Sequence, residues 1–456
     1  MLNNTVSETV SNSMPNQKIQ SVTMQTSKRI ISVIGRDFRL NDNPFFEGWK
    51  EHEIIPVFIL DPFNQEEHGS NLKSLFFEYV LDFKRKLEEK NSHLYIVKLD
   101  DFESFLLKSK ADAVRYSFDG EPNTLKRGHL IENICKRNFV KFISLWNFLI
   151  KPEKGSFRHR FNDFYTRVFK PSMESDRIKT IDPPIFLKTP KIEHQDEPLP
   201  SYNKRQNIIK LWFKDEKSVL MSFSDFLKKN LSSYHINRDL PAVDGTSKLS
   251  PYLRIGVVSI RQIYKMVKEH PQSEPFLREL AWAEFFRVWL SLHPFVIERE
   301  FRKEWIDFPW ERNLELFEKW KKGETGFDLV DAGMTQLMQE GWIHNRVRMV
   351  VASFLTKNLL LDWRLGERFF YENLVDADLA ANVGNWQWIA GCGLDAAPYF
   401  RIFNPELQLK KFDPKGNYVS KYVNEKHAKI VELERSRLNF LRIAKEFRER
   451  WNLRKK

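Results

Sequence analysis

The chain has 456 residues, which is enough for two or three domains with buried cores. Its formal net charge of +12 favours a polyanionic partner such as nucleic acid, although many basic proteins bind none. Two cysteines exclude a disulfide framework or a zinc site and fit a reducing, cytoplasmic setting. No apolar run approaches the ~20 residues that cross a bilayer.

Residues 1–28 are rich in Ser, Asn, Thr and Gln and contain no apolar core segment. A secretory signal peptide needs an apolar stretch, and a transit peptide is Arg-rich and amphipathic, so neither fits. A segment with so little apolar surface cannot offset the entropy lost on folding. We therefore expect a disordered tail.

Residues 29–150 alternate between two kinds of apolar pattern. Short β-branched and aromatic runs predict strands, and helical spacing separates some of them. The predicted strands are residues 30–34, 54–60, 93–99, 113–118 and 140–144, and the predicted helices are residues 72–90 and 123–136. Such alternation indicates an α/β domain with a Rossmann-like parallel sheet. No GxGxxG follows the first strand, so nucleotide binding in this half has no direct support.

Residues 151–205 contain seven prolines, a density that breaks regular elements and predicts an interdomain linker. From residue 206 to residue 456 nearly everything follows a 3.6-residue period, for example residues 276–292 and 341–362. This second half is therefore expected to be an all-α domain. Its last stretch, residues 426–456, predicts a charged, solvated amphipathic helix.

The most informative segment is residues 376–405, DADLAANVGNWQWIAGCGLDAAPYFRIFNP. Carboxylates, an amide and two indoles occur within thirteen residues, and such groups suit a pocket for a large aromatic redox group. If the segment is helical, Trp386 and Trp388 point to nearly opposite sides, so one can face a buried cofactor and the other outward. A tryptophan-rich core helix with polar ends is the plainer alternative.

Residues 244–253, DGTSKLSPYL, place hydroxyls before a helical run, where free backbone N–H groups suit a phosphate. Plain N-capping is the commoner explanation of such a string.

Residues 341–349, GWIHNRVRM, contain two arginines, Arg346 and Arg348. Because they are two residues apart, their side chains point in different directions, so that one can pair with a carboxylate inside the protein and the other with an anion outside. His344 has no second ligand at metal spacing, which favours a structural role.

Residues 278–285, RELAWAEF, lie in an apolar helical pattern. Glu279 and Trp282 share a helix face at i, i+3 spacing, and a buried glutamate needs a partner. A glutamate on the helix surface is the default alternative.

Taken in this order and spacing, these motifs resemble the DNA photolyase/cryptochrome family, and most closely the class I cyclobutane pyrimidine dimer photolyases. The similarity runs from about residue 30 to residue 416 and is dense in DGTSKLSPYL, RELAWAEF, GWIHNRVRM, LLLDWRLGERFF and DADLAANVGNWQW. It implies an α/β N-terminal domain and a helical domain that binds FAD. It also implies a monomeric, cytoplasmic enzyme in which light-excited FADH⁻ lends an electron to a dimer flipped out of UV-damaged DNA.

The resemblance implies a role for each motif residue. The residues expected to bind FAD are Tyr234, Thr246, Ser247, Lys248, Leu249, Ser250, Arg348, Asp376, Ala377, Asp378 and Asn382. Asn382 is expected at flavin N5, and Arg348 is expected to pair with Asp376. The indoles expected to carry electrons from the surface to the flavin are Trp310, Trp363 and Trp386.

The residues expected to contact damaged DNA are Arg238, Glu279, Trp282, Asn345, Arg346, Met349, Trp388 and Arg401. Trp282 and Trp388 would form aromatic walls, and Glu279 would bind the pyrimidine edges. Asn345 and Met349 would line the floor, and the three arginines would contact backbone phosphates.

The chain also departs from the family pattern. Val33–Asp37 replaces the usual Trp-Phe-Arg-Arg-Asp, and Asp119–Pro122 is only loosely similar, which leaves open whether a folate or deazaflavin antenna is bound.

The chief rival function is a cryptochrome-type blue-light sensor. Asn382 favours repair, because plant and insect cryptochromes carry Asp or Cys at this position. A (6-4) photolyase would have paired histidines around His344, and a light-independent nucleic-acid-binding module would hold no flavin.

Overall fold

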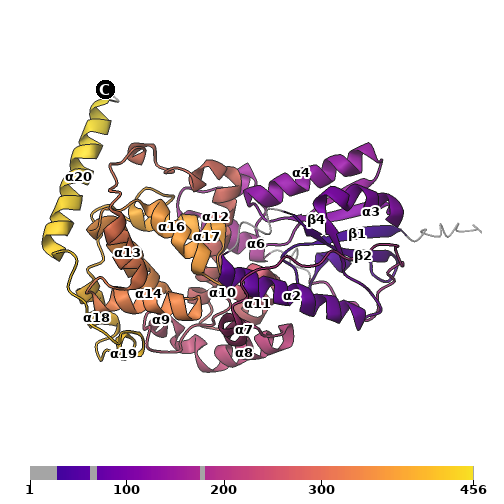
Figure 1. Ribbon diagram of the computed structural model, residues 1–456, viewed down its shortest axis with the longest axis horizontal. Coiled ribbons are helices and arrows are strands. Elements are labelled where there is room, and N and C mark those ends of the chain that lie inside the picture. Colours follow the sequence, from indigo (N-terminus) through magenta and orange to yellow (C-terminus); the bar gives the residue numbers. More distant parts are fainter. Residues whose placement is uncertain (1–27, 62–68, 175–179, 455–456) are drawn as a thin grey trace, which may run out of the picture.

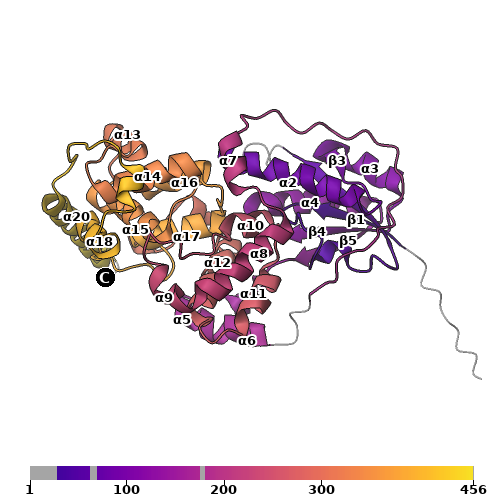
Figure 2. The same ribbon diagram turned by 90° about the horizontal axis from the view of Figure 1, so that it is seen from below.

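The computed structural model describes residues 28–61, 69–174 and 180–454 (Figure 1). The tail expected at residues 1–28 lies, but for its last residue, outside this range. An α/β domain and a helical domain lie side by side along the long axis of the molecule (Figures 1 and 2). The predicted fold class is confirmed.

The α/β domain is built on a five-stranded parallel sheet in the order β3-β2-β1-β4-β5. Its strands are β1 (Arg29–Ile34), β2 (Glu53–Leu60), β3 (Tyr95–Lys98), β4 (Ala113–Phe118) and β5 (Lys141–Trp146), and its helices are α2 (Ser70–Glu88), α3 (Phe102–Ser109) and α4 (Pro122–Arg137). β1 and β2 are almost wholly buried, as expected for parallel strands covered on both faces. The strand order reverses between β1 and β4, the place where open α/β sheets form a crevice.

The linker is less irregular than expected. Residues 161–174 form a helical segment made of α5 (Phe161–Phe164), a π turn (Tyr165–Phe169) and α6 (Lys170–Glu174). Aromatic side chains at helical spacing explain this, because Phe161, Phe164 and Phe169 bury one face of the segment. Residues 180–205 contain no helix or strand and run back along the α/β domain, where Ile54 N–H donates to Lys188 O at 2.9 Å.

The helical domain packs many short helices around its core. They are α7 (Gln206–Trp212), α8 (Glu216–Lys229), α9 (Tyr234–Asn237), α10 (Ser250–Ile255), α11 (Ile260–Lys268), α12 (Glu274–Leu292), α13 (Leu314–Lys322), α14 (Asp328–Glu340), α15 (Asn345–Ser353), α16 (Trp363–Asn373), α17 (Leu379–Ala390), α18 (Pro405–Phe412), α19 (Val419–Tyr422) and α20 (Leu433–Arg454). Within the described ranges, no helix has the length and apolar character needed to cross a membrane.

The helical pattern expected over residues 341–362 is interrupted at both ends. Gly341 has a φ of +65° and ends α14, and α15 begins only at Asn345. Near the other end, Leu360 has a φ of +55° after a π turn at Phe354–Asn358. Left-handed backbone cannot continue a right-handed helix, so the periodic segment is divided.

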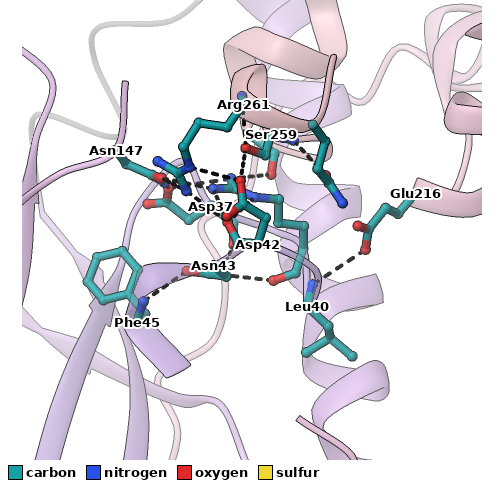
Figure 3. Close-up of polar contacts among 12 residues, drawn as sticks. Asp37, Leu40, Asp42, Asn43, Phe45, Asn147, Glu216, Ser259 and Arg261 are labelled. Carbon is teal, nitrogen blue, oxygen red and sulfur yellow. Dashed lines mark hydrogen bonds and ion pairs between the residues drawn. The ribbon is translucent and has the colours of Figure 1, made fainter. Parts of the chain in front are cut away.

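A buried polar cluster joins the two domains (Figure 3). Asp42 accepts hydrogen bonds from Ser259 Oγ and from Arg261 Nε, the latter at 2.9 Å. Asn147 Oδ1 accepts from the guanidinium groups of Arg261 and Arg39, at 3.0 and 2.9 Å. Buried charges are costly unless they are paired, and these pairs hold the domains in one arrangement.

Gly256 lies at a close contact between the two domains. Its carbonyl accepts a hydrogen bond from Arg39 Nη1 at 3.1 Å, and its φ is +80°. A Cβ added at this position would lie 1.7 Å from the carbonyl oxygen of Arg36. Only glycine fits this contact and this backbone conformation.

Candidate active site

A cavity of about 590 Å³ opens in the helical domain, within the size range of cofactor pockets. Arg36, Asp37, Asn147 and Phe148 bring the α/β domain to its wall. The expected FAD, DNA and electron-transfer residues that line it are Tyr234, Arg238, Thr246, Ser247, Lys248, Leu249, Ser250, Glu279, Trp282, Asn345, Arg346, Arg348, Met349, Asp376, Asp378, Asn382, Trp386, Trp388 and Arg401. Residues far apart in sequence thus share one cavity.

Two carboxylates stand at the start of α17. Asp376 accepts hydrogen bonds from Arg348 Nη2 at 2.9 Å and from Ser250 Oγ at 2.6 Å. Asp378 caps α17, and its Oδ2 lies 3.1 Å from Arg287 Nη2. Burial raises the pKa of Asp378, but Arg287 and a backbone N–H outweigh it, so this pKa lies below its ordinary value. Arg287 was not among the residues expected from the sequence.

The loop before α10 supplies hydroxyl groups to the same cavity. Thr246 and Ser247 line it, and neither hydroxyl has a hydrogen-bond partner among the residues the structure describes. Lys248 has a φ of +50° and places its Nζ 2.8 Å from Asp244. Unpartnered hydroxyls beside aromatic walls fit a ligand with a diphosphate and a large ring system, as FAD has.

Asn382 is oriented by a glutamate that the sequence did not reveal. Its Nδ2 donates to both the backbone oxygen and Oε1 of Glu367, each at 2.8 Å. Both amide hydrogens are therefore used, and this network leaves Oδ1 as the free polar atom of the side chain. Burial raises the pKa of Glu367 to about 7, although Asn382 opposes the rise, so this carboxyl changes protonation near neutral pH.

Ala377 is the one expected FAD residue that does not line the cavity. It is buried, and its carbonyl accepts a hydrogen bond from Arg254 Nε. Arg254 also pairs with Glu121 of the α/β domain at 3.0 Å. The backbone between the two site carboxylates is thus anchored to the other domain.

The expected lesion walls, Trp282 and Trp388, line the same cavity. The Trp282 ring stacks on Phe161, with centroids 3.7 Å apart and planes at 5°. The guanidinium of Arg401 lies 6.0 Å from the centroid of Trp388. Phe161 was missed because it belongs to the segment taken as a linker.

The polar groups expected to meet DNA are already engaged in part. Glu279 Oε1 lies 2.7 Å from Arg238 Nη1, and burial raises the pKa of Glu279 against the opposing effect of Arg238. Arg346 Nη2 lies 2.6 Å from Asp239 Oδ1. Among the described residues, Arg401 is the only one of the three expected phosphate-binding arginines without a carboxylate partner.

His344 has the structural position expected for it. Its Nδ1 accepts a hydrogen bond from Arg346 N–H at 3.2 Å and so caps α15. Burial lowers the pKa of His344 to about 4, which keeps the ring neutral and able to accept. Across the described ranges, no cluster of His, Cys, Asp and Glu suits a metal ion.

The three expected electron-carrying indoles differ in their surroundings. Trp386 lines the cavity and has ring contacts with Phe370 and Trp320, at centroid distances of 5.1 and 6.2 Å. Trp363 is fully buried, and Trp310 is half-buried. A Cβ at Gly366 would lie 2.2 Å from the Trp386 ring, so this glycine makes room for the indole.

Two family models match the chain: DNA photolyase over residues 32–180 and the FAD binding domain of DNA photolyase over residues 276–435. A deoxyribodipyrimidine photo-lyase of Alkalihalophilus pseudofirmus is 35% identical over 426 residues, 86% of each chain. The chain belongs to the DNA photolyase family. A photolyase of Agrobacterium fabrum is 41% identical over 88% of this chain and 87% of its own. The fold is similar to the crystal structure of a bacterial class III photolyase from Agrobacterium tumefaciens, with a TM-score of 0.83 and 28% sequence identity. The match covers 95% of this chain and 100% of that chain.

In this member of the photolyase family the helical domain is therefore an FAD-binding domain.

A second, smaller cavity lies at the carboxyl ends of β1 and β4, lined by Gly35, Arg36, Tyr116, Arg127 and Phe148 among others. Its volume of about 40 Å³ suits a few water molecules. A folate or deazaflavin antenna does not fit this cavity as it stands.

Proposed function

We propose that this photolyase binds UV-damaged DNA and uses light to split cyclobutane pyrimidine dimers. The observation that carries the proposal is a single cavity that joins the expected flavin residues Asp376 and Asn382 to the expected dimer residues Glu279, Trp282 and Trp388. The enzyme class is that of the deoxyribodipyrimidine photo-lyases, which match most of the chain. FAD, when bound, supplies light absorption and an electron that is lent to the dimer and returned.

The polar residues of the cavity would hold the flavin. Thr246 and Ser247 are suited to donate to its diphosphate, because their hydroxyls have no hydrogen-bond partner in the part of the chain that the structure describes. The ion pair of Arg348 with Asp376 gives the site a fixed guanidinium and a fixed carboxylate. Asn382 presents Oδ1 and is suited to accept a hydrogen bond from flavin N5–H, with Glu367 holding the amide in that orientation.

The aromatic residues would receive the flipped dimer. Trp282, braced by Phe161, and Trp388 provide stacking surfaces, which repay part of the few kcal/mol needed to unstack the bases. Glu279 is suited to bind the pyrimidine edges. Arg401 is free to contact a phosphate, whereas Arg238 and Arg346 would have to exchange a carboxylate for a phosphate when DNA binds.

Three finer points complete the proposal. Trp310, Trp363 and Trp386 would carry electrons inward, with half-buried Trp310 as the outer member. The class I assignment stays a prediction from the motifs, because a class III photolyase is among the similar structures. We also propose a monomer, which light scattering on the purified protein would check.

The proposed reaction is tested with chemically reduced protein and UV-irradiated oligothymidine. Blue light should restore the absorbance of the thymine band, because splitting a dimer regenerates two 5,6-double bonds, and a dark sample should show no change. No light-dependent recovery, with reduced flavin present, would instead favour a sensor that keeps the fold without repair.

Replacing Trp388 by alanine should weaken binding of dimer-containing DNA about 10- to 100-fold, because stacking contributes about 1–3 kcal/mol per base. Flavin content should stay at the wild-type level. Phe400→Ala, an exposed aromatic in the following loop, is the matched control and should leave both quantities unchanged. Fluorescence anisotropy with damaged and undamaged oligonucleotides measures the effect. Equal loss of flavin and DNA binding would contradict the role of Trp388 as a lesion wall.

A further inference from the structure

Glu300 is a buried carboxylate to which the proposed function assigns no role. It lies between two short 3₁₀ turns, Pro294–Ile297 and Lys303–Trp305, and is only 2% exposed. Its Oε1 accepts a hydrogen bond from Trp363 Nε1 at 3.2 Å. A carboxylate taken out of water costs several kcal/mol unless it is paired, so this position requires a partner.

Arg364 provides that partner, and it also lies against the indole. Its Nη2 donates to both oxygens of Glu300, each at 2.9 Å, and its Nη1 lies 3.0 Å from Asp362 Oδ1. The guanidinium carbon is 4.9 Å from the centroid of Trp363. One guanidinium is thus shared by two carboxylates, and the group around the Trp363 ring keeps a net negative charge.

This charge lies beside an indole that is fully buried. Where water is excluded, two charges a few ångströms apart interact several times more strongly than they do in water. A positive charge that forms on Trp363 is therefore stabilised by Glu300. The hydrogen bond to Nε1 also fixes the ring against rotation, because Nε1–H is the indole's single donor.

We propose that Glu300 positions Trp363 and stabilises its one-electron-oxidised form, which favours transfer of the hole from Trp386 to Trp363. The proposal rests on the electron route described under the proposed function. Once Trp386 has lost an electron, one electron passes from Trp363 to Trp386, and the positive charge moves to Trp363 while its N–H stays bonded to Glu300. An electron from Trp310 then restores Trp363, and a thiol in solution restores Trp310, giving up one electron and releasing its proton to water.

Glu300→Gln tests the charge, because the amide keeps the size and can still accept from Nε1 but carries no charge. Glu298→Gln is the matched control: it removes the same charge two residues away, where the side chain is exposed and only the backbone oxygen contacts Arg364, at 2.7 Å. After a laser flash, transient absorption measures the tryptophan radicals that outlive the fast return of the electron. We expect about a tenfold lower yield in Glu300→Gln and the wild-type yield in Glu298→Gln. Equal yields in the two variants would overturn the proposal.

Asp362→Asn gives a second measurement, and it applies even if Glu300→Gln does not fold. Its amide oxygen can still accept from the Arg364 N–H at the start of α16 but carries no charge, so the group around Trp363 becomes neutral and the radical on Trp363 should live for a shorter time than in wild type; an unchanged or longer lifetime would overturn the proposal. Trp363→Phe separates this inference from the route itself. If that variant keeps the wild-type radical yield, the electron route through Trp363 is wrong and the role of Glu300 is wrong with it. If that variant loses the radical while Glu300→Gln keeps it, only the role of Glu300 is wrong.

Discussion

Arg348→Ala is expected to yield protein that is purified with little or no flavin. Asp376 is 8% exposed and would lose its guanidinium partner. Removing one member of a buried ion pair costs about 3–5 kcal/mol, and the partial exposure of Arg348 favours the lower end. Since 1.4 kcal/mol is a factor of ten, FAD affinity should fall on the order of 100-fold. The ratio of flavin to protein absorbance and a titration of the flavin-free protein with FAD would measure this.

Arg346→Ala is the control for this experiment. It removes the same side chain two residues earlier on α15, where the partner is Asp239 rather than Asp376. We expect this variant to keep its flavin and to bind DNA more weakly, with a smaller salt dependence. A flavin content in Arg348→Ala equal to that of Arg346→Ala would show that the Arg348–Asp376 pair does not hold the cofactor.

Gly256→Ala should cause the largest loss of stability of any single methyl addition considered. The new Cβ would meet the Arg36 carbonyl oxygen at 1.7 Å, and the φ of +80° would strain any side chain. Overpacking costs about 1–3 kcal/mol and left-handed backbone about 1–2 kcal/mol, so the total is about 2–5 kcal/mol. Thermal unfolding should begin several degrees lower, with the domain interface opening first.

Gly416→Ala separates the two contributions to that loss. Gly416 also has a positive φ, +67°, but no atom lies within 4 Å of an added Cβ. This variant should therefore lose only the about 1–2 kcal/mol of backbone strain. Similar unfolding midpoints for the two variants would mean that the contact between Gly256 and Arg36 is not rigid.

The sheet could be predicted from the sequence because its strands are continuous apolar runs, which is how parallel strands buried on both faces appear. The cavity lining could be predicted only through the resemblance, since nothing in the spacing of Ser250, Arg348 and Asp376 says that they meet. The interruption at Gly341 does have a local sequence signal, because a glycine commonly follows the last residue of a helix.

Glu367, Glu300 and Phe161 could not be found in this way. The first lies on an amphipathic helix and resembles a solvated glutamate, and the second lies in an irregular connection. Their roles depend on contacts with Asn382 and Trp363, which are distant in sequence. The local sequence pattern predicts burial and secondary structure. It does not predict a hydrogen bond between side chains that are distant in sequence, because such a bond depends on the tertiary structure.

The stack of Phe161 on Trp282 bears on how genes of this kind can recombine. A chimera joined near residue 206 would take one ring of this stack from each parent, and a mismatch in size would tilt Trp282. A crossover upstream of residue 161 would inherit both rings together. Functional hybrids between relatives should therefore have their junctions before this residue, inside the stretch that follows β5.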